Sequence, residues 1–347
     1  MSHRVFYLTL VQPEKTRYNN RMSNIRRLNI FDKNQLKKIA ELASPNANYY
    51  FKYHLMKECA CIAQSFLPLR FKFMPESYVY SDDRCIKGMI SVFPTQGNPE
   101  QININRLLFE NNDYHTGKEL INFIIKHYGE EGAKTFKVVI DNNHKELEQL
   151  FMEGCGFRCG SYENLWDISH DINYFKDIKP LELKNATDSH AGLIAELNNS
   201  ELITHYRPAM EQTEEEFHEP LVKIFNNKYE DNFVLLCSDS AVAYLTVQTN
   251  DNFNFIISLT KNNGYNLSYD EIIAYGIQSI ISKRNSDFRV YLKQKKYLKF
   301  AQDYETYLHA RNYECIQTQH VLLKEFYKPI KQEFQAFVFG ENKLLSN

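Results

Sequence analysis

Apolar and polar residues alternate in three consecutive runs of the first half of the chain, 77–82, 85–93 and 101–109. Alternation of period two predicts half-buried strands, and the short Ser-Asp-Asp turn between the first two runs predicts a hairpin. The spacing then changes to that of an amphipathic helix over 119–128. The apolar stripe of this helix consists of Leu120, Ile121, Ile124, Ile125 and Tyr128.

The same succession returns in the second half of the chain. Alternating runs at 233–239, 241–249 and 253–260 again predict three strands, and a helical stripe follows them. This stripe repeats the spacing of the first one 152 positions later, at Ile272, Ile273, Gly276, Ile277 and Ile280. Two stripes of one spacing, each behind three strands, indicate a repeated unit.

Other segments match at nearly the same displacement. FKVVI (136–140) corresponds to FRVYL (288–292), and the tetrapeptide IAEL occurs at 39–42 and 194–197. A period of about 150 residues is too long for a solenoid repeat, so each copy is expected to be a domain. In each, a strand and helix precede the antiparallel strands, and a helix, strand, helix and closing strand follow. This order predicts an α+β fold with a mixed central sheet flanked by helices.

The duplication divides the chain into two domains joined by a short linker. The expected parts are an N-terminal extension (1–23), domain 1 (24–169), a linker (170–179), domain 2 (180–328) and a C-terminal tail (329–347).

Composition narrows the function classes. The 347 residues suit two domains, 43% hydrophobic residues suffice for two cores, and the formal net charge of −2 disfavours nucleic acid as the main partner. One basic run, 283–299, holds seven Lys or Arg residues with interleaved tyrosines and keeps nucleic-acid binding as a third interpretation. Because the run falls on a predicted strand and turn, a solvated sheet edge is the simpler interpretation.

Cysteine usage and hydropathy point to a cytoplasmic protein. The seven cysteines are scattered, and none has zinc-ligand spacing with nearby histidines, so we expect reduced thiols and no metal. No segment approaches the roughly 20 apolar residues of a membrane span. The first residues lack a signal-peptide pattern.

The loop NNDYHTGKEL (111–120) lies between a predicted strand and the helix 119–128. The first N–H groups of a helix lack intrahelical partners, and the helix dipole favours an anion there. Gly117 would let the backbone approach such an anion, and Lys118 could add a positive charge. The alternative is that Gly117 only relieves a turn and Lys118 is a solvated residue.

This order of elements, together with that loop and with LFMEGCGF (150–157) before YENLWDI (162–168), resembles the GCN5-related N-acetyltransferase (GNAT) family. The resemblance covers most of the chain as two tandem copies. In the family, a Gln/Arg-x-x-Gly-x-Gly/Ala loop holds the pyrophosphate of acetyl-CoA. Asn112, His115 and Gly117 take the three defined positions here, and only Gly117 keeps the pattern.

The resemblance implies acetyl-CoA as cosubstrate of the first copy. It implies that the strands 101–109 and 136–140 separate and that backbone groups beside the gap hold the acyl carbonyl and pantetheine. The expected cofactor-binding residues are Leu107, Leu108, Phe109, Asn112, His115, Thr116, Gly117 and Lys118.

The catalytic groups of the family are less evident. The position of its usual tyrosine acid falls on Phe151 and Met152, neither of which carries a hydroxyl. Glu110, just after the strand, and His115, in the loop, are the candidate bases.

The second copy departs further from the family. In KNNGYNLSYDEII (261–273), Tyr269 takes the position of Gly117, and Ser268 with Glu271 is expected to form a capping box. A helix end capped by its own side chains, with acidic residues beside it, is a poor pyrophosphate site. We expect no acetyl-CoA there.

Two functions remain open. The first is an acetyl-CoA-dependent N-acetyltransferase that uses domain 1 and acts on a primary amine of a small molecule or peptide. The second is an inactive GNAT-like pseudoenzyme that binds acyl-CoA or serves as an interaction scaffold. The tandem arrangement suits a monomer whose two domains imitate a dimer, but the sequence decides neither the oligomeric state nor the amine.

Overall fold

The structure, a computed structural model, describes seven ranges of the chain: 24–50, 75–82, 85–95, 97–218, 229–249, 251–283 and 287–326. The extensions expected at 1–23 and 329–347 lie outside the described residues.

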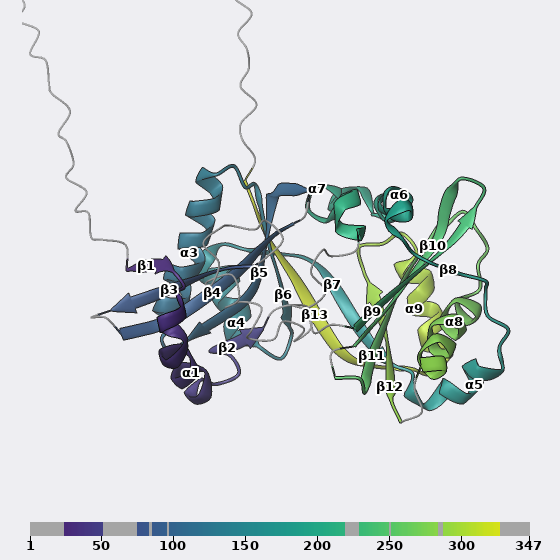
Figure 1. The fold of residues 1–347 in the computed structure, drawn as a ribbon, viewed down its shortest axis with the longest axis horizontal. Coiled ribbons are helices and arrows are strands. Elements are labelled where there is room, and N and C mark those ends of the chain that lie inside the picture. Colours follow the sequence, from purple (N-terminus) through teal and green to yellow (C-terminus); the bar gives the residue numbers. More distant parts are fainter. Residues whose placement is uncertain are drawn as a thin grey trace, which may run out of the picture.

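A single 13-stranded sheet runs through the described part of the molecule (Figure 1). The strands of the first half are β1 (Ile25–Arg27), β2 (Asn48–Tyr50), β3 (Glu76–Asp82), β4 (Cys85–Thr95), β5 (Asn98–Phe109), β6 (Thr135–Asp141) and β7 (Arg158–Asp167). Those of the second half are β8 (Lys184–Asn185), β9 (Tyr229–Cys237), β10 (Ser240–Thr249), β11 (Asn254–Lys261), β12 (Arg289–Lys295) and β13 (Glu314–Glu325). Their order is β1-β3-β4-β5-β6-β13-β7-β12-β11-β10-β9-β8, with β2 also pairing with β5.

Helices cover both faces of this sheet. The first half contains α1 (Lys33–Leu42), α3 (Tyr114–Glu130) and α4 (Lys145–Gln149), which continues as a π-helical turn (Leu150–Gly154). The second half contains α5 (Ile172–Asp177), α6 (Ala191–Glu201), α7 (Arg207–Met210), α8 (Tyr269–Lys283) and α9 (Ala301–Ala310).

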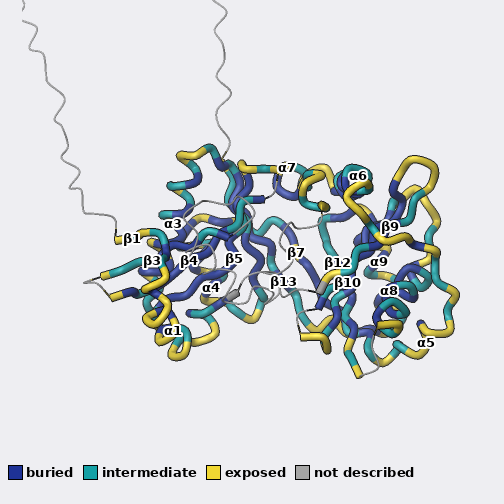
Figure 2. The backbone as a smooth tube through the Cα atoms, viewed as in Figure 1, coloured by how far each residue is buried: buried dark blue, intermediate teal, exposed yellow. Residues whose placement is uncertain are grey.

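The alternation of each strand decides which helix its side chains meet. Met89 and Leu108 pack with α1 on one face, whereas Ile90 and Leu107 belong to the core under α3 and α4. In the second half, Tyr244 packs with α6, and its neighbour Leu245 joins the core that contains α8 and α9. The predicted α+β architecture of two tandem units is confirmed. Buried residues follow the sheet through both halves (Figure 2).

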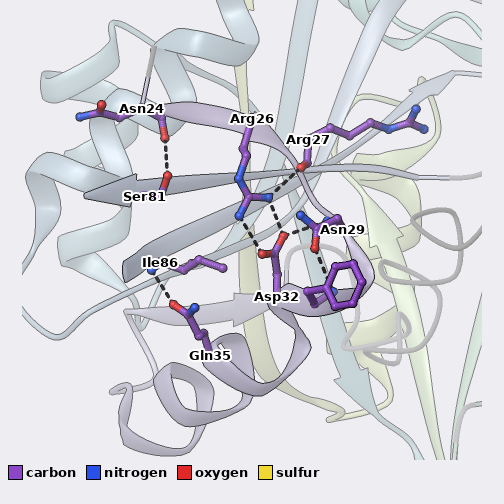
Figure 3. A network of polar contacts seen from close by, with 9 residues as sticks. Asn24, Arg26, Arg27, Asn29, Asp32, Gln35, Ser81 and Ile86 are labelled. Atoms are coloured by element: carbon purple, nitrogen blue, oxygen red, sulfur yellow. Dashed lines mark hydrogen bonds and ion pairs between the residues drawn. The ribbon is translucent and has the colours of Figure 1, made fainter. Parts of the chain in front are cut away.

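Polar contacts fix the start of α1 to the sheet (Figure 3). Arg26 donates two hydrogen bonds of 2.7 Å to the carboxylate of Asp32, and Asn29 and Asp32 cap the helical turn before α1 reciprocally. The side chain of Gln35 accepts a hydrogen bond from Ile86 N of β4 at 2.8 Å. Because these contacts hold α1 against the sheet, residues 44–50, which follow α1, lie beside the end of β5.

The two halves exchange their closing strands. β7 follows the first half in sequence, yet it pairs with β12, while β13 of the second half pairs with β6. β7 and β13 run antiparallel to each other at the centre of the sheet. Each half therefore completes its sheet with a strand from the other.

A buried ion pair lies where the halves meet. Lys293 Nζ of β12 lies 2.5 Å from Glu163 Oε2 of β7, and only 8% of each side chain is exposed. Tyr297 OH donates a 2.7 Å hydrogen bond to the other carboxylate oxygen. A charge buried so deeply depends on its partner, so this pair couples the stability of the two halves.

The expected linker, 170–179, contains α5. Phe175 of α5 is fully buried, and Gln278 of α8 donates hydrogen bonds to the carbonyl oxygens of Phe175 and Ile178. The connection is packed onto the second half.

Candidate functional site

The parallel strands β5 and β6 pair only over a short stretch and then separate. Their register runs from Gln101 opposite Thr135 to Asn103 opposite Lys137. β5 then continues to Phe109, and β6 continues to Asp141. This separation lies where the resemblance to the GNAT family implies the acyl-thioester site, and α3 begins just beyond the end of β5.

Residues 44–50, called here the strap, lie along the same edge of β5 as β6, beyond the point where β6 stops pairing with it. β2, the end of the strap, pairs antiparallel with β5, with Tyr49 opposite Leu107, and Phe109 N donates a 2.8 Å hydrogen bond to Ala47 O. Backbone groups of a strand alternate between its two sides, so Leu107 and Phe109 turn theirs toward the strap and Leu108 toward β4. The groups expected to hold pantetheine and the acyl carbonyl are thus engaged within the chain.

Tyr49 of the strap contacts both of the strands that separate, β5 through its backbone and β6 through its hydroxyl. Its hydroxyl accepts a 3.0 Å hydrogen bond from Asp141 N at the end of β6. Its ring meets His144 edge-on, with the ring centroids 4.4 Å apart. Burial raises the pKa of Tyr49 to about 12, so the phenol stays neutral near physiological pH.

Three asparagines hold the strap to its surroundings. Asn46 Nδ2 donates to Glu146 Oε2 at 2.9 Å, and its Oδ1 lies 2.7 Å from His144 Nδ1. Asn48 Oδ1 accepts from Arg106 at 3.0 Å. Asn111, in the loop before α3, donates to Leu42 O at 2.7 Å and accepts from Ser44 N. The strap is therefore tied to α4 at one point and to the loop before α3 at another.

The N-terminus of α3 is capped by a carboxylate. Asp113 accepts hydrogen bonds from Thr116 N at 3.2 Å and from Thr116 Oγ1 at 2.6 Å, and Gly117 N lies 3.4 Å from Asp113 O. This negative charge lies where the resemblance implies the pyrophosphate. The sequence reasoning missed it, although Asp before the first helical turn is a common N-cap signal.

Gly117 has a packing reason of its own. A Cβ at this position would lie 3.1 Å from Leu150 Cδ2 and 3.3 Å from Phe109 Cε1, so its absence allows α3 to approach β5 closely. Thr116 is buried in the cap, while His115 and Lys118 are exposed beside it. His115 and Lys118 are thus open to solvent and able to meet a ligand.

The remaining loop residues do not converge on one centre. Asn112 is exposed and adopts a left-handed conformation with φ of 62°, as a tight turn requires. Glu110 accepts hydrogen bonds from Lys87 Nζ at 3.0 and 3.2 Å. The imidazole of His115 makes no side-chain hydrogen bond within the described part of the chain.

The position of the family's tyrosine acid is part of the core. Phe151 is fully buried and meets Phe157 edge-on at 5.1 Å between centroids, and Met152 packs against the same cluster. A hydroxyl that the sequence reasoning overlooked is that of Tyr114, which donates to Glu146. Burial is the main cause that raises the pKa of Tyr114 to about 12.

In the second half, the N-terminus of α8 packs against tyrosine rings of α9. Tyr269 is buried, stacks on Tyr304 at 4.9 Å between centroids and donates a 2.7 Å hydrogen bond to Asp303. The expected capping box does not form: within the described residues, neither the Ser268 hydroxyl nor the Glu271 carboxylate accepts a hydrogen bond from the backbone N–H of the other residue, and at Ser268 it is the carbonyl oxygen that accepts one, from Ile272 N. Packing of the Tyr269 ring against α9, rather than a capping box, holds the start of α8.

At least three of the seven basic residues of the run 283–299 pair with acidic residues. Besides Lys293, which pairs with Glu163, Lys283 Nζ lies 2.5 Å from Asp231 and Lys296 Nζ lies 2.5 Å from Glu305. Over the described ranges, no three His, Cys, Asp or Glu side chains are grouped as a metal ion would require. None of the helices described is both long and apolar enough to cross a membrane.

Comparisons with known proteins establish the fold. No family model and no curated protein match the chain. Among solved structures, a tandem GNAT protein from the clavulanic acid biosynthesis pathway superposes with a TM-score of 0.55 at 10% identity, over 88% of this chain and 99% of the other. A conserved protein from Enterococcus faecalis V583, described as a probable N-acyltransferase, gives 0.53 at 9% identity, over 87% and 72%. The chain has the tandem GNAT fold.

Proposed function

We propose that this protein is an acetyl-CoA-dependent N-acetyltransferase that uses its first half and acts in the cytoplasm on a primary amine of a small molecule or peptide. The separation of β5 from β6, with α3 starting at its open end, carries the proposal. The Enterococcus neighbour, described as a probable N-acyltransferase, belongs to the same class of enzyme.

The exposed Lys118 ammonium and His115 imidazole at the start of α3 suit the anionic part of such a substrate. Lys118 and His115 lie in the first turn of α3, where the helix dipole also favours negative charge. The N–H of Phe109 is placed to donate to an acyl oxygen once the strap no longer uses it.

The reaction forms a C–N bond and breaks a C–S bond. The amine loses a proton and the departing thiolate gains one. Glu110 is a candidate to take the proton from the amine, and in this structure its carboxylate forms an ion pair with Lys87. The thiolate is already a fair leaving group, so an acid at Phe151 is not indispensable.

The second candidate is an inactive scaffold with the same fold. The Asp113 carboxylate at the N-terminus of α3 favours it, because two anions at one helix end repel each other. The absence of a hydroxyl at Phe151 favours it as well.

Calorimetric titration of the full chain with acetyl-CoA separates the two candidates. We expect saturable binding below about 1 mM and a roughly tenfold loss of affinity in Lys118→Glu. Lys126→Glu, an equally exposed charge reversal further along α3, is the matched control and should leave the affinity unchanged. Release of free thiol with a panel of amines then tests turnover. If no variant binds, including those with a loosened strap described below, the scaffold is the better account.

A further inference from the structure

We infer that the strap, residues 44–50, is an autoinhibitory segment that holds the acyl-thioester position of the first half closed and must leave β5 before acetyl-CoA binds. This inference rests on the proposed function, since it concerns the regulation of the same site. It starts from a competition for backbone groups. The strap pairs with β5 at Arg106, Leu107 and Leu108 and accepts from Phe109 N, and a strand edge pairs with one partner at a time.

The duplicated fold does not itself require a strap. In the second half, β11 and β12 also stop pairing, at Ser258 opposite Lys293, while β11 runs on to Lys261. The segment after α6, the counterpart of α1, does not join β11; Leu202 bridges to Leu298 and Ile203 N donates to Tyr297 O at 3.0 Å. Within the described residues β11 pairs only with β10 and β12. The second half thus has the same fold although, in its described part, no strap pairs with the corresponding edge of β11.

The strap is held by contacts that can be exchanged. Its ladder with β5 has three residue pairs, and two of its polar contacts, Asn46 with Glu146 and Ser44 N with Asn111, lie at the surface where water can replace them. Among the strap's described side chains, Ala47 and Tyr49 are buried and pack into the core under α3 and α4. A short attachment with few buried apolar side chains and exchangeable polar contacts is typical of a segment that opens locally.

A hinge and a clasp lie at the start of the strap. α1 stays on the sheet through Leu36 and Ile39, and the backbone leaves the helical conformation at Ala43, with ψ of 140°. Asn111 clasps the residues on both sides of this hinge, Leu42 and Ser44. Because Asn111 belongs to the loop at the N-terminus of α3, an anion that displaces this loop would also release the strap.

The first experiment loosens the strap without touching the loop. Asn46→Ala/Tyr49→Phe removes the bonds to Glu146, His144 and Asp141 N. We expect its acetyl-CoA Kd, measured by calorimetry, to fall at least about tenfold, because a larger fraction of molecules is open. Tyr78→Phe is the matched control, a buried phenol of the first half whose hydroxyl bonds Glu76 away from the strap, and it should bind like the natural chain.

The second experiment locks the strap. Asn48 and Leu108 face each other as a non-hydrogen-bonded pair, the closer kind, so Asn48→Cys/Leu108→Cys offers a cross-strand disulfide. The oxidised protein should not bind acetyl-CoA, and reduction of the same sample should restore binding. Oxidised and reduced natural chain control for the native cysteines.

Hydrogen exchange supplies a readout besides affinity. On addition of acetyl-CoA, the amide of Tyr49 should exchange faster while that of Phe109 stays protected by its new partner. Equal affinity of the loosened and natural chains, or undiminished binding by the oxidised lock, overturns the strap and leaves the proposed function standing. No binding by any form, including the loosened and reduced ones, overturns both.

Discussion

The N-termini of α3 and α8 occupy equivalent places in the two halves and are closed by different means. At α3 the closure is polar, since Asp113 caps the helix and Asn111 ties the loop to the strap. At α8 it is a packed cluster in which the ring of Tyr269 stacks on Tyr304 and lies tilted against Tyr307. Polar contacts at a surface can be exchanged for a ligand, whereas a buried ring cluster cannot open without losing core. This difference supports the proposal that the first half, rather than the second, binds the cosubstrate.

The largest effect on stability is expected from removing the Tyr304 ring from the tyrosine cluster at α8. Tyr304 is 1% exposed, so Tyr304→Ala should lower the free energy of unfolding by about 3 to 5 kcal/mol in chemical denaturation. The acetyl-CoA affinity of the folded protein should not change. Tyr304→Phe is the control and should cost almost nothing, because the buried hydroxyl has no hydrogen-bond partner among the described residues. A tolerated alanine would contradict the view of α8 as permanently closed.

The ion pair between the halves should give the next largest effect. Glu163→Ala leaves the Lys293 ammonium buried without its main partner and should cost about 3 kcal/mol. Because β7 and β13 are exchanged, both halves should still unfold in one transition, followed by tryptophan fluorescence and far-UV circular dichroism together. Two separated transitions would show that the exchanged strands do not couple the halves.

A smaller effect is expected from the charge at α3. Asp113→Asn keeps a capping side chain and removes the negative charge, so stability should fall by no more than about 1 kcal/mol. Acetyl-CoA affinity should rise several-fold in calorimetry. Asp270→Asn makes the corresponding change beside α8, where Asp270 pairs with Arg311, and should leave the affinity as it was. A similar gain from both variants would remove the distinction between the two helix ends.

The smallest effect concerns Gly117. Gly117→Ala gains helix propensity of up to about 1 kcal/mol but brings its Cβ to 3.1 Å from Leu150, so the two should nearly cancel in thermal unfolding. Gly129→Ala, near the other end of α3, meets no atom within 4 Å and should show the gain alone. If both variants gain equally, Gly117 is not retained for packing.

Much of the fold was predictable because it is local. The stripe from Leu120 to Tyr128 and its repeat from Ile272 to Ile280 predicted α3 and α8, and alternation located the strands within a few residues. The Asp113 cap was equally local and could have been predicted. The capping box expected at Ser268 does not form, and the start of α8 is instead packed by Tyr269 against Tyr304, a contact between residues far apart in the sequence that local patterns do not reveal.

The sequence by itself determined the duplication, the order of elements and the absence of a hydroxyl at Phe151. Only the tertiary structure decided that β7 and β13 change places and that the strap, and not β6, pairs with the end of β5. The physical reason is that alternation specifies which face of a strand is buried but not which edge it joins. Backbone donors and acceptors are the same at every residue, so the choice of partner emerges only when the whole sheet packs.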